Sequence, residues 1–419
     1  MAERIFVIGH SAVTSLGSSL RETWESLCAG RSGLARHESL GSDRFLQGIG
    51  GLVPGLGPNG ADADTRLSRL DARFLHLGLA AAQQAWDEAG LDGREELDRG
   101  RVAIVVGSAF GGVDLLERET QNAARRKSLA TSPYLVPGMI INQAAGQIAE
   151  HLRVYGPSCA PANACASGGH AVALGAMLLR SGEADFAICG ASESAFVPWV
   201  VNGFATMKAL FPNKPNDRSI EDPSQASRPF SSDRAGFVLS EGAGMIVLAR
   251  ASAAKRFEAK ALAELIGWGS NSDGHHMAMP EPKRVACCLD LALRRSEIEP
   301  KDVDYYNAHG TSTVLNDRVE TQAIESVFAD HARRMPISSI KGALGHSLGA
   351  ASAIEASVAV HCILEQTIPP TINHIPDPEL ALDALHHNVR KRGGADGVHD
   401  VWQDDRVAGD VGCDNGERA

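Results

Sequence analysis

The sequence predicts an α/β protein built from two similar βαβ-rich halves. The first observation is an alternation of patterns. The apolar, largely β-branched runs at 4–9 and 102–106 are typical of buried strands, and the apolar spacing over 70–89 is typical of a helix between them. Strands that alternate with helices favour a parallel sheet covered by helices. The second observation is an internal repeat, because segments of the first half recur in the same order in the second half.

The predicted elements of the first half follow one another closely. Residues 4–9, RIFVIG, predict a buried strand, and the Gly and Ser residues after it suit a turn into a helix over 20–28. Residues 31–66 are rich in Gly and Pro, so we expect an irregular excursion on the surface. A helix over 70–89 and a strand over 102–106 follow, and the strand ends at the glycines of GSAFGG.

Three pairs of segments carry the repeat. IFVIGH has a counterpart in AELIGWG, VAIVVGSAFGG has one in VDYYNAHGTST, and NACASGGHAVALGAMLL has one in IKGALGHSLGAASAIEASVAV. The third pair assigns His346 to the place that Cys165 occupies in the first half. Two packed copies of one unit would bring equivalent loops together near a pseudo-symmetry axis, so we expect the function to lie between the halves.

Composition and charge exclude several classes of protein. Of the 419 residues, 44% are hydrophobic and 22% are charged, as in an ordinary soluble enzyme. The formal net charge of -11 argues against nucleic-acid binding, which needs a broad basic surface. There is neither an apolar run of the about 18 residues that a membrane span needs nor a signal-peptide pattern, so we expect a cytoplasmic protein. The eight cysteines show no CxxC spacing and indicate neither disulfides nor zinc.

Cys165 stands out among the cysteines because of its surroundings. It precedes a helix-compatible apolar run and is followed by Ala166, Ser167 and two glycines. A cysteine in the first turn of a helix is favoured as a thiolate by the helix dipole and by free N–H groups, and small neighbours let a substrate approach. We therefore interpret Cys165 as a nucleophile, although an isolated cysteine is more often a small buried apolar residue.

Two histidines lie in glycine-rich turns that follow predicted strands. His309 stands in NAHGTST after the strand-like VDYY, and His346 stands in SSIKGALGHSLGAAS. One such histidine would be unremarkable, but two of them at repeat-related positions indicate a shared catalytic role. Lys341 lies five residues before His346 and could pair with Glu320 in the helix after HGTST, although surface ion pairs of this kind contribute little to stability.

Four segments together resemble a known family. NACASG, RPFSSDRAGFVLSEGAG, NAHGTSTVLND and IKGALGHSLGAAS are similar to signatures of the β-ketoacyl-acyl-carrier-protein synthases, the decarboxylating, elongating ketosynthases of fatty-acid and polyketide pathways. The resemblance implies an α/β, thiolase-like fold with two similar βαβ-rich halves in a five-layer α-β-α-β-α arrangement. We expect an N-terminal half over 1–255 and a C-terminal half over 256–392. The usual assembly of such proteins is a homodimer.

The resemblance also implies roles for individual residues. Cys165 would be the acylated nucleophile, His309 and His346 the two catalytic histidines, and Lys341 with Glu320 a supporting ion pair. The candidate substrate-binding residues are Thr311 and Thr313, which would contact the pantetheine arm, and Phe204.

The implied reaction is an acyl transfer followed by a condensation. An acyl group moves from an acyl carrier protein to Cys165, malonyl carrier loses carbon dioxide, and the resulting carbanion attacks the acyl group. Two neutral imidazoles would stabilise the enolate oxygen. The chemistry requires neither a metal nor a redox cofactor, and GSAFGG lacks the spacing of a dinucleotide loop. The phosphopantetheine of the carrier would enter as a substrate arm.

Three alternatives remain beside this interpretation. A degradative thiolase would need a second cysteine as base, and the sequence around Cys413, VGCDNGE, gives little support for that role. A non-catalytic chain-length partner subunit should lack the nucleophile, whereas Cys165 is present. A catalytically impaired ketosynthase homologue that acts as a dimer partner is the third alternative.

The end of the chain raises the third alternative. Family members should continue after residue 392 into a strand and a loop of the type SNSFGFGGTNA, which supplies an oxyanion-hole N–H and a gating Phe. Residues 393–419 are instead rich in Gly and Asp with almost no apolar periodicity. They read as a disordered tail or, as we favour, the product of a shifted reading frame that replaces the expected last strands.

Overall fold

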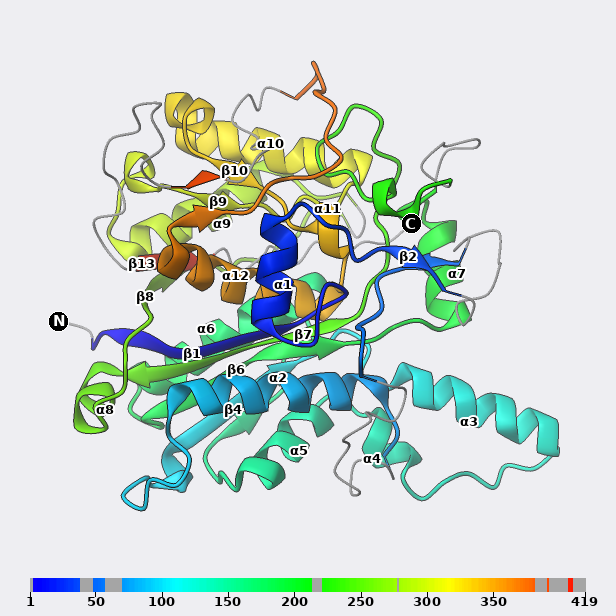
Figure 1. The fold of residues 1–419 in the computed structure, drawn as a ribbon, viewed down its shortest axis with the longest axis vertical. Helices are drawn as coiled ribbons and strands as arrows, with labels where there is room; N and C mark the ends of the chain where they lie inside the picture. Colours follow the sequence, from blue (N-terminus) through cyan, green and yellow to red (C-terminus); the bar gives the residue numbers. More distant parts are fainter. Residues whose placement is uncertain are drawn as a thin grey trace.

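The structure is a computed structural model with an extended central sheet and helices on both of its faces (Figure 1). It describes residues 3–37, 48–56, 70–212, 221–276 and 279–380, together with the backbone of 390–391 and 406–409.

The central sheet has seven strands in the order β13-β8-β1-β7-β6-β4-β5. β4 is parallel to β5 and to β6, whereas β7 is antiparallel to β6 and to β1. The parallel sheet expected from the sequence is thus a mixed one, because β1 and β7 meet as antiparallel neighbours. The strands are β1 (Ile5–Val13), β4 (Val102–Gly107), β5 (Ser158–Cys159), β6 (Phe186–Glu193), β7 (Gly242–Arg250), β8 (Ala263–Trp268) and β13 (Arg406–Gly409).

Helices cover the two faces of this sheet. One face packs through Phe74, Leu77 and Trp86 of α2 and through Ile148 of α5, and these residues share a core with strands β1, β4, β6 and β7. The opposite face packs against α6 and α12, which lie side by side between the halves (Figure 1). These helices are α2 (Arg73–Ala89), α5 (Gln143–Leu152), α6 (Ser167–Arg180) and α12 (Ala351–Glu365).

The second half adds a further layer of strands and a further layer of helices. Its parallel strands β9 and β10 share a core with α9 and α10, formed by residues such as Leu289, Tyr306, Ala323 and Ile337. The layers therefore run α2 and α5, the central sheet, α6 and α12, and then the core that β9 and β10 share with α9 and α10. These elements are β9 (Tyr306–Asn307), β10 (Ile337–Ser338), α9 (Pro282–Ser296) and α10 (Val314–Phe328).

The remaining elements are short or lie at the periphery. The helices are α1 (Leu20–Cys28), α3 (Val113–Arg126), α4 (Leu135–Met139), α7 (Pro198–Thr206), α8 (Ala251–Arg256) and α11 (Lys341–Leu344). The strands are β2 (Ala35–Arg36), β3 (Ile49–Gly50), β11 (Thr367–Ile368) and β12 (Arg390–Lys391).

Local sequence explains several boundaries. α1 begins after Ser19, whose side chain accepts a hydrogen bond from the backbone N–H of Glu22, so the predicted helix over 20–28 is confirmed. α2 begins three residues later than predicted because Asp71 takes a left-handed conformation with φ 48°. It ends at Gly90, whose φ of 63° favours glycine.

The predicted surface excursion and the predicted tail are only partly described. Residues 38–47 and 57–69 lie outside the described residues, and within the excursion β2 pairs with β3, so it is not wholly irregular. Of the tail at 393–419, the structure describes only β13, which pairs in parallel with β8 at the edge of the central sheet. The rest of the predicted disordered or frame-shifted tail lies outside the described residues.

Candidate active site

The nucleophile candidate sits on a strained turn directly before a helix. Cys165 lies in a single 3₁₀ turn, Ala164–Ala166, that runs into α6. Ala164 has φ 48°, a left-handed conformation that costs an alanine on the order of 1 kcal/mol. Cys165 thus lies one turn ahead of the regular helix rather than within its first turn, and it is half-buried. The helix start still presents its positive end toward this turn.

The second half repeats this turn, but in a different register from the one that the sequence indicated. The 3₁₀ turn Leu348–Ala350 leads into α12, and Leu348 has φ 47°, which matches Ala164 in the first half. The residue equivalent to Cys165 is therefore Gly349. The predicted equivalence of Cys165 with His346 is wrong by three residues, because small residues on both sides of the turn allowed the sequences to be aligned in more than one register.

Hydrogen bonds join the two turns across the boundary between the halves. The hydroxyl of Ser352 donates to the backbone oxygen of Cys165 at 3.2 Å and accepts from the backbone N–H of Gly169 at 2.9 Å. A Cβ on Gly168 would lie 2.7 Å from Cβ of Ala353, so glycine is needed for this close approach. The helix starts of α6 and α12 therefore fix each other.

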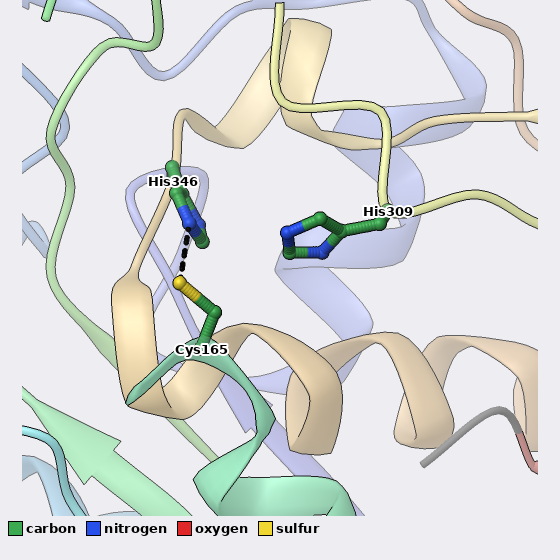
Figure 2. Close-up of side chains that lie close together, drawn as sticks. All are labelled: Cys165, His309 and His346. Carbon is green, nitrogen blue, oxygen red and sulfur yellow. Dashed lines mark hydrogen bonds between the residues drawn. The ribbon is translucent and has the colours of Figure 1, made fainter. Parts of the chain in front are cut away.

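His346 contacts the sulfur directly. Its Nε2 lies 3.1 Å from Sγ of Cys165, a contact between residues 181 positions apart (Figure 2). The backbone holds the histidine from both sides, because its N–H donates to the oxygen of Val238 at 2.7 Å and its oxygen accepts from the N–H of Ser240 at 3.0 Å. The residue is buried, with only 1% of its surface exposed.

His309 completes the group on the other side of the same space. Its ring meets the ring of His346 edge-on, with centroids 5.4 Å apart and an interplanar angle of 86° (Figure 2). Lys341 places its ammonium nitrogen 3.3 Å from Nδ1 of His309. The structure therefore brings Cys165, His309, His346 and Lys341 together, as the sequence led us to expect.

The partner of Lys341 is a correction to the sequence prediction. Its ammonium makes a buried ion pair with Glu355 of α12, not with Glu320. Glu320 instead accepts hydrogen bonds from the backbone N–H groups of His309 at 2.7 Å and Gly310 at 2.8 Å. It therefore shapes the loop that carries His309. Glu355 was not among the predicted site residues, although a single glutamate in the apolar stretch ASAIEASVAV is a signal for a buried charged residue with a partner.

The electrostatics of the site favour neutral histidines. Burial, followed by the positive charge of Lys341, lowers the pKa of both His309 and His346 well below the ordinary value of 6.5. Burial raises the pKa of Glu320 to about 7, and the nearby charge of Lys341 lowers it only in part. Both imidazoles are therefore uncharged near neutral pH and able to donate one N–H each.

An aromatic row connects the predicted substrate residue Phe204 to the site. The ring of Phe204 meets that of Phe237 at 5.2 Å, and the ring of Phe237 meets that of His346 at 5.4 Å, both edge-on. Phe237 was not singled out in the sequence. Phe204 is therefore linked to His346 through one intervening ring, that of Phe237.

The two predicted threonines lie on the loop between His309 and α10. Their hydroxyl oxygens are 2.9 Å apart, and both residues are buried. The hydroxyl of Thr313 also accepts from the N–H of Asn316 and caps the start of α10. Thr313 therefore has a structural role besides any contact with a substrate.

Among the described residues, Cys165, His309 and His346 form a group that could hold a metal ion. The ligand atoms of Cys165, His309 and His346 lie within 4.8 Å of one another. One thiolate and two imidazoles suit Zn²⁺, but the ammonium of Lys341 beside His309 would oppose a second positive charge. The arrangement thus suits a nucleophilic thiol with two imidazole donors better than a metal centre.

Within the described residues, one helical stretch, Leu348–Glu365, is long and apolar enough to cross a membrane. Of this stretch, 61% is buried inside the protein, because α12 packs between the halves.

Fold and site together define a protein of two related halves that share one group of a thiol and two imidazoles. Family comparison agrees: the Beta-ketoacyl synthase N-terminal domain matches residues 2–254 and the Beta-ketoacyl synthase C-terminal domain matches residues 262–374. The chain belongs to the β-ketoacyl synthase family.

Individual relatives are similar along most of the chain. The 3-oxoacyl-acyl-carrier-protein synthase 2 of Coxiella burnetii is 35% identical over 391 residues, covering 93% of this chain and 92% of its own. The protein of the same name from Vibrio cholerae is 34% identical over 396 residues and covers 93% of each chain.

Solved structures agree on a thiolase-like fold. The ishigamide ketosynthase/chain length factor superposes with a TM-score of 0.84 at 30% identity, covering 93% of this chain and 94% of that one. A β-ketoacyl synthase from Burkholderia phymatum gives 0.83 at 29% identity, covering 93% of each chain. A ketosynthase solved with its type II PKS acyl-carrier protein gives 0.82 at 29% identity, also covering 93% of each.

Proposed function

We propose that this chain catalyses a decarboxylating Claisen condensation between an acyl group held on Cys165 and a malonyl group on an acyl carrier protein. The products are a β-ketoacyl carrier protein and carbon dioxide, as in fatty-acid or polyketide biosynthesis. One observation carries the proposal: a thiol and two neutral imidazoles, drawn from both halves, face one another (Figure 2). The similarity to curated 3-oxoacyl-acyl-carrier-protein synthases supports it.

The first step is an exchange of thioesters. Sγ of Cys165 attacks the carbonyl carbon of an acyl-carrier thioester, the bond from that carbon to the carrier's sulfur breaks, and the carrier thiol leaves with the proton. The start of α6 lies next to Cys165 and stabilises the thiolate. Because one thioester replaces another, the acyl carbonyl stays reactive.

The second step is decarboxylation of the malonyl group. The bond to the carboxylate breaks, carbon dioxide leaves, and the electron pair passes onto the thioester oxygen as an enolate. His309 and His346 each donate a hydrogen bond from Nε2–H to that oxygen and keep the proton, and each donor of this kind is worth about 3 to 4 kcal/mol. They are suited to this role because burial keeps their pKa values low and the rings neutral.

The third step forms the new carbon–carbon bond. The carbanion attacks the acyl carbonyl on Cys165, the bond from that carbonyl to Sγ breaks, and the thiolate is regenerated. We assign supporting roles to the residues around this group. Lys341 and Glu355 orient His309, and Glu320 holds its loop.

The substrates would reach this group from two sides. We expect Thr311 and Thr313 to contact the pantetheine arm, and we expect Phe204, at the far end of the aromatic row, to contact the acyl chain. We expect no metal or redox cofactor, because every step balances without one. The phosphopantetheine arrives as part of the carrier.

We further propose a homodimer that acts in the cytoplasm and takes acyl and malonyl thioesters from an acyl carrier protein. Similar structures include a ketosynthase with its acyl-carrier protein and a ketosynthase/chain length factor. The alternative, an impaired homologue or non-catalytic partner subunit, is disfavoured because Cys165 is present with His346 3.1 Å from its sulfur.

The test is to incubate the purified chain with acyl and malonyl carrier protein, measure β-ketoacyl product, and map the acyl adduct by mass spectrometry. We expect the acyl group on Cys165 and no product from Cys165→Ser. The exposed Cys159 provides the matched control, and Cys159→Ser should retain full activity. Labelling at Cys159 or Cys189 with Cys165 untouched would contradict the proposal.

A further inference from the structure

A second carboxylate lies close to the reactive turns, and the reaction described above does not use it. Glu193 is the last residue of β6 and is 0% exposed. Its partners among the described residues are hydroxyl and backbone N–H groups, not a cationic side chain. Four hydrogen-bond donors surround it instead, and they come from both halves of the chain.

Three of these donors belong to the loop that follows β4. Oε1 of Glu193 accepts from the hydroxyl of Ser108 at 2.9 Å and from the N–H of Phe110 at 3.3 Å, and Oε2 accepts from the N–H of Ala109 at 2.6 Å. The Ser108 hydroxyl in turn accepts from the N–H of Gly111 at 2.9 Å. One carboxylate therefore fixes the path of the whole loop.

The fourth donor lies in the other half. The backbone N–H of Gly349 bonds to Glu193, and a Cβ at Gly349 would lie 2.7 Å from both Oε2 of Glu193 and the nitrogen of Ala109. Gly349 is the pseudo-symmetric equivalent of Cys165 and follows His346 by three residues. Only glycine fits where the carboxylate, the loop and the turn meet.

The same loop also supports the nucleophile turn. The N–H of Ser108 donates to the oxygen of Pro161 at 3.4 Å, and a Cβ on Gly107 would lie 2.9 Å from the oxygen of Ser167. The loop thus lies against the segments on both sides of Cys165. Both reactive turns therefore rest on a loop that Glu193 holds in place.

A side-chain route leads from this loop to the catalytic group as well. The ring of Phe110 meets that of Phe204 at 6.2 Å, and the row continues through Phe237 to His346. Since the carboxylate fixes the backbone of Phe110, a displaced loop would disturb His346 through its turn and through this row.

We propose that Glu193 is a positioning residue that sets the contact between Cys165 and His346 by tying the loop after β4 to the turn after His346. It touches neither the sulfur nor an imidazole, so it acts through backbone placement. This inference rests on the proposed function for its kinetic readout, but the contact it concerns belongs to the chain itself.

Glu193→Gln is the decisive variant. The amide keeps the size of the side chain, but its NH₂ group faces N–H donors where the carboxylate accepted from them, so the loop must move. Burial raises the pKa of Glu193 to about 7 while its donors lower it, so we choose about pH 8, where the carboxylate is ionised. At this pH, we expect kcat for condensation, per labelled Cys165, to fall roughly ten- to a hundredfold with KM for malonyl carrier unchanged.

A second readout needs no turnover. We expect the rate at which iodoacetamide alkylates Cys165 to fall at least about threefold, since the sulfur loses its fixed surroundings. The matched control is Glu264→Gln. Glu264 lies on β8, and its buried carboxylate accepts a hydrogen bond from Arg4 at 2.8 Å. This variant should lower the melting temperature to a similar extent and change neither rate.

The outcomes separate the two claims. If Glu193→Gln turns over and alkylates within twofold of the unmodified chain, the positioning role is wrong. If the unmodified chain does not condense, the proposed function fails and the alkylation rates still decide the role of Glu193. Should Glu193→Gln not fold, Ser108→Ala removes one of the four bonds and should lower both rates about two- to fivefold; rates within error of the unmodified chain would overturn the inference.

Discussion

The ammonium nitrogen of Lys341 lies 3.3 Å from Nδ1 of His309. Because an ammonium group can only donate a hydrogen bond, Nδ1 must accept, and the proton of the neutral ring then resides on Nε2. This contact selects the tautomer that can donate to a substrate oxygen. Glu355 holds the ammonium in place from the neighbouring helix α12.

Replacement of Lys341 should therefore impair decarboxylation through the tautomer of His309. In Lys341→Met we expect the rate of malonyl decarboxylation to fall roughly ten- to a hundredfold, measured as carbon dioxide release, with a smaller effect on acyl loading. Because Glu355 would lose its ion pair with Lys341, Lys341→Met/Glu355→Gln should be more stable than the single variant yet equally slow. Lys301 is exposed, so Lys301→Met is the control. If Lys341→Met loses no more of its decarboxylation rate than this control does, the tautomer argument is wrong.

The two histidines should serve decarboxylation more than acyl loading. In His309→Ala and in His346→Ala we expect acylation of Cys165 to remain measurable while malonyl decarboxylation falls by about two orders of magnitude or more, because each loses one donor to the enolate oxygen. Mass spectrometry follows the first step and carbon dioxide release the second. Equal loss in both steps would show that the division of roles is wrong.

Stability should fall in acid because of the same histidines. Their pKa values lie well below 6.5 in the folded chain, so only the unfolded chain takes up their protons just below that pH. The stabilisation is fully present above pH 6.5 and is lost as the pH falls toward the folded pKa values, by up to about 1.4 kcal/mol per pH unit for each ring.

Urea unfolding measured between about pH 7.5 and 5 tests this dependence. We expect His309→Asn/His346→Asn to flatten the acid slope relative to the unmodified chain. The exposed His151→Asn should leave the slope as it is. If the free energy of unfolding falls with pH equally steeply in all three chains, groups other than these two histidines cause the loss of stability in acid.

The end of the chain offers the fourth prediction. We expect replacement of residues 393–419 by a hydrophobic strand and a Gly-Phe-Gly-Gly type loop to raise both the melting temperature and the condensation rate, because it would supply a sheet strand and an oxyanion donor together. β13 pairs with β8 in the chain as it stands. If the unaltered chain melts as high and condenses as fast as the repaired one, its own tail already meets both needs.

The sequence by itself determined the local elements and the chemically distinctive residues. The helix Leu20–Cys28 followed from the Gly- and Ser-rich turn before it and the strand at Val102 from its apolar pattern, and both signals act between near neighbours along the chain. Cys165, His309 and His346 stood out because their residue types and glycine-rich surroundings suit nucleophilic chemistry. Similarity of the two halves predicted that these residues would meet, although it aligned His346 with Cys165 in the wrong register.

Only the tertiary structure decided how they meet. The register of the repeat became clear from the left-handed Ala164 and Leu348, because backbone conformation distinguishes turns that small residues leave ambiguous in sequence. Lys341 could have paired with Glu320 of α10 or with Glu355 of α12. The packing of the two helices brings Glu355 within reach of its ammonium group. The role of Glu193 could not be predicted from the sequence for the same reason. Its hydrogen bonds to backbone groups of distant loops form only once the halves have packed. Backbone donors require no particular residue type, so they leave no pattern in the sequence.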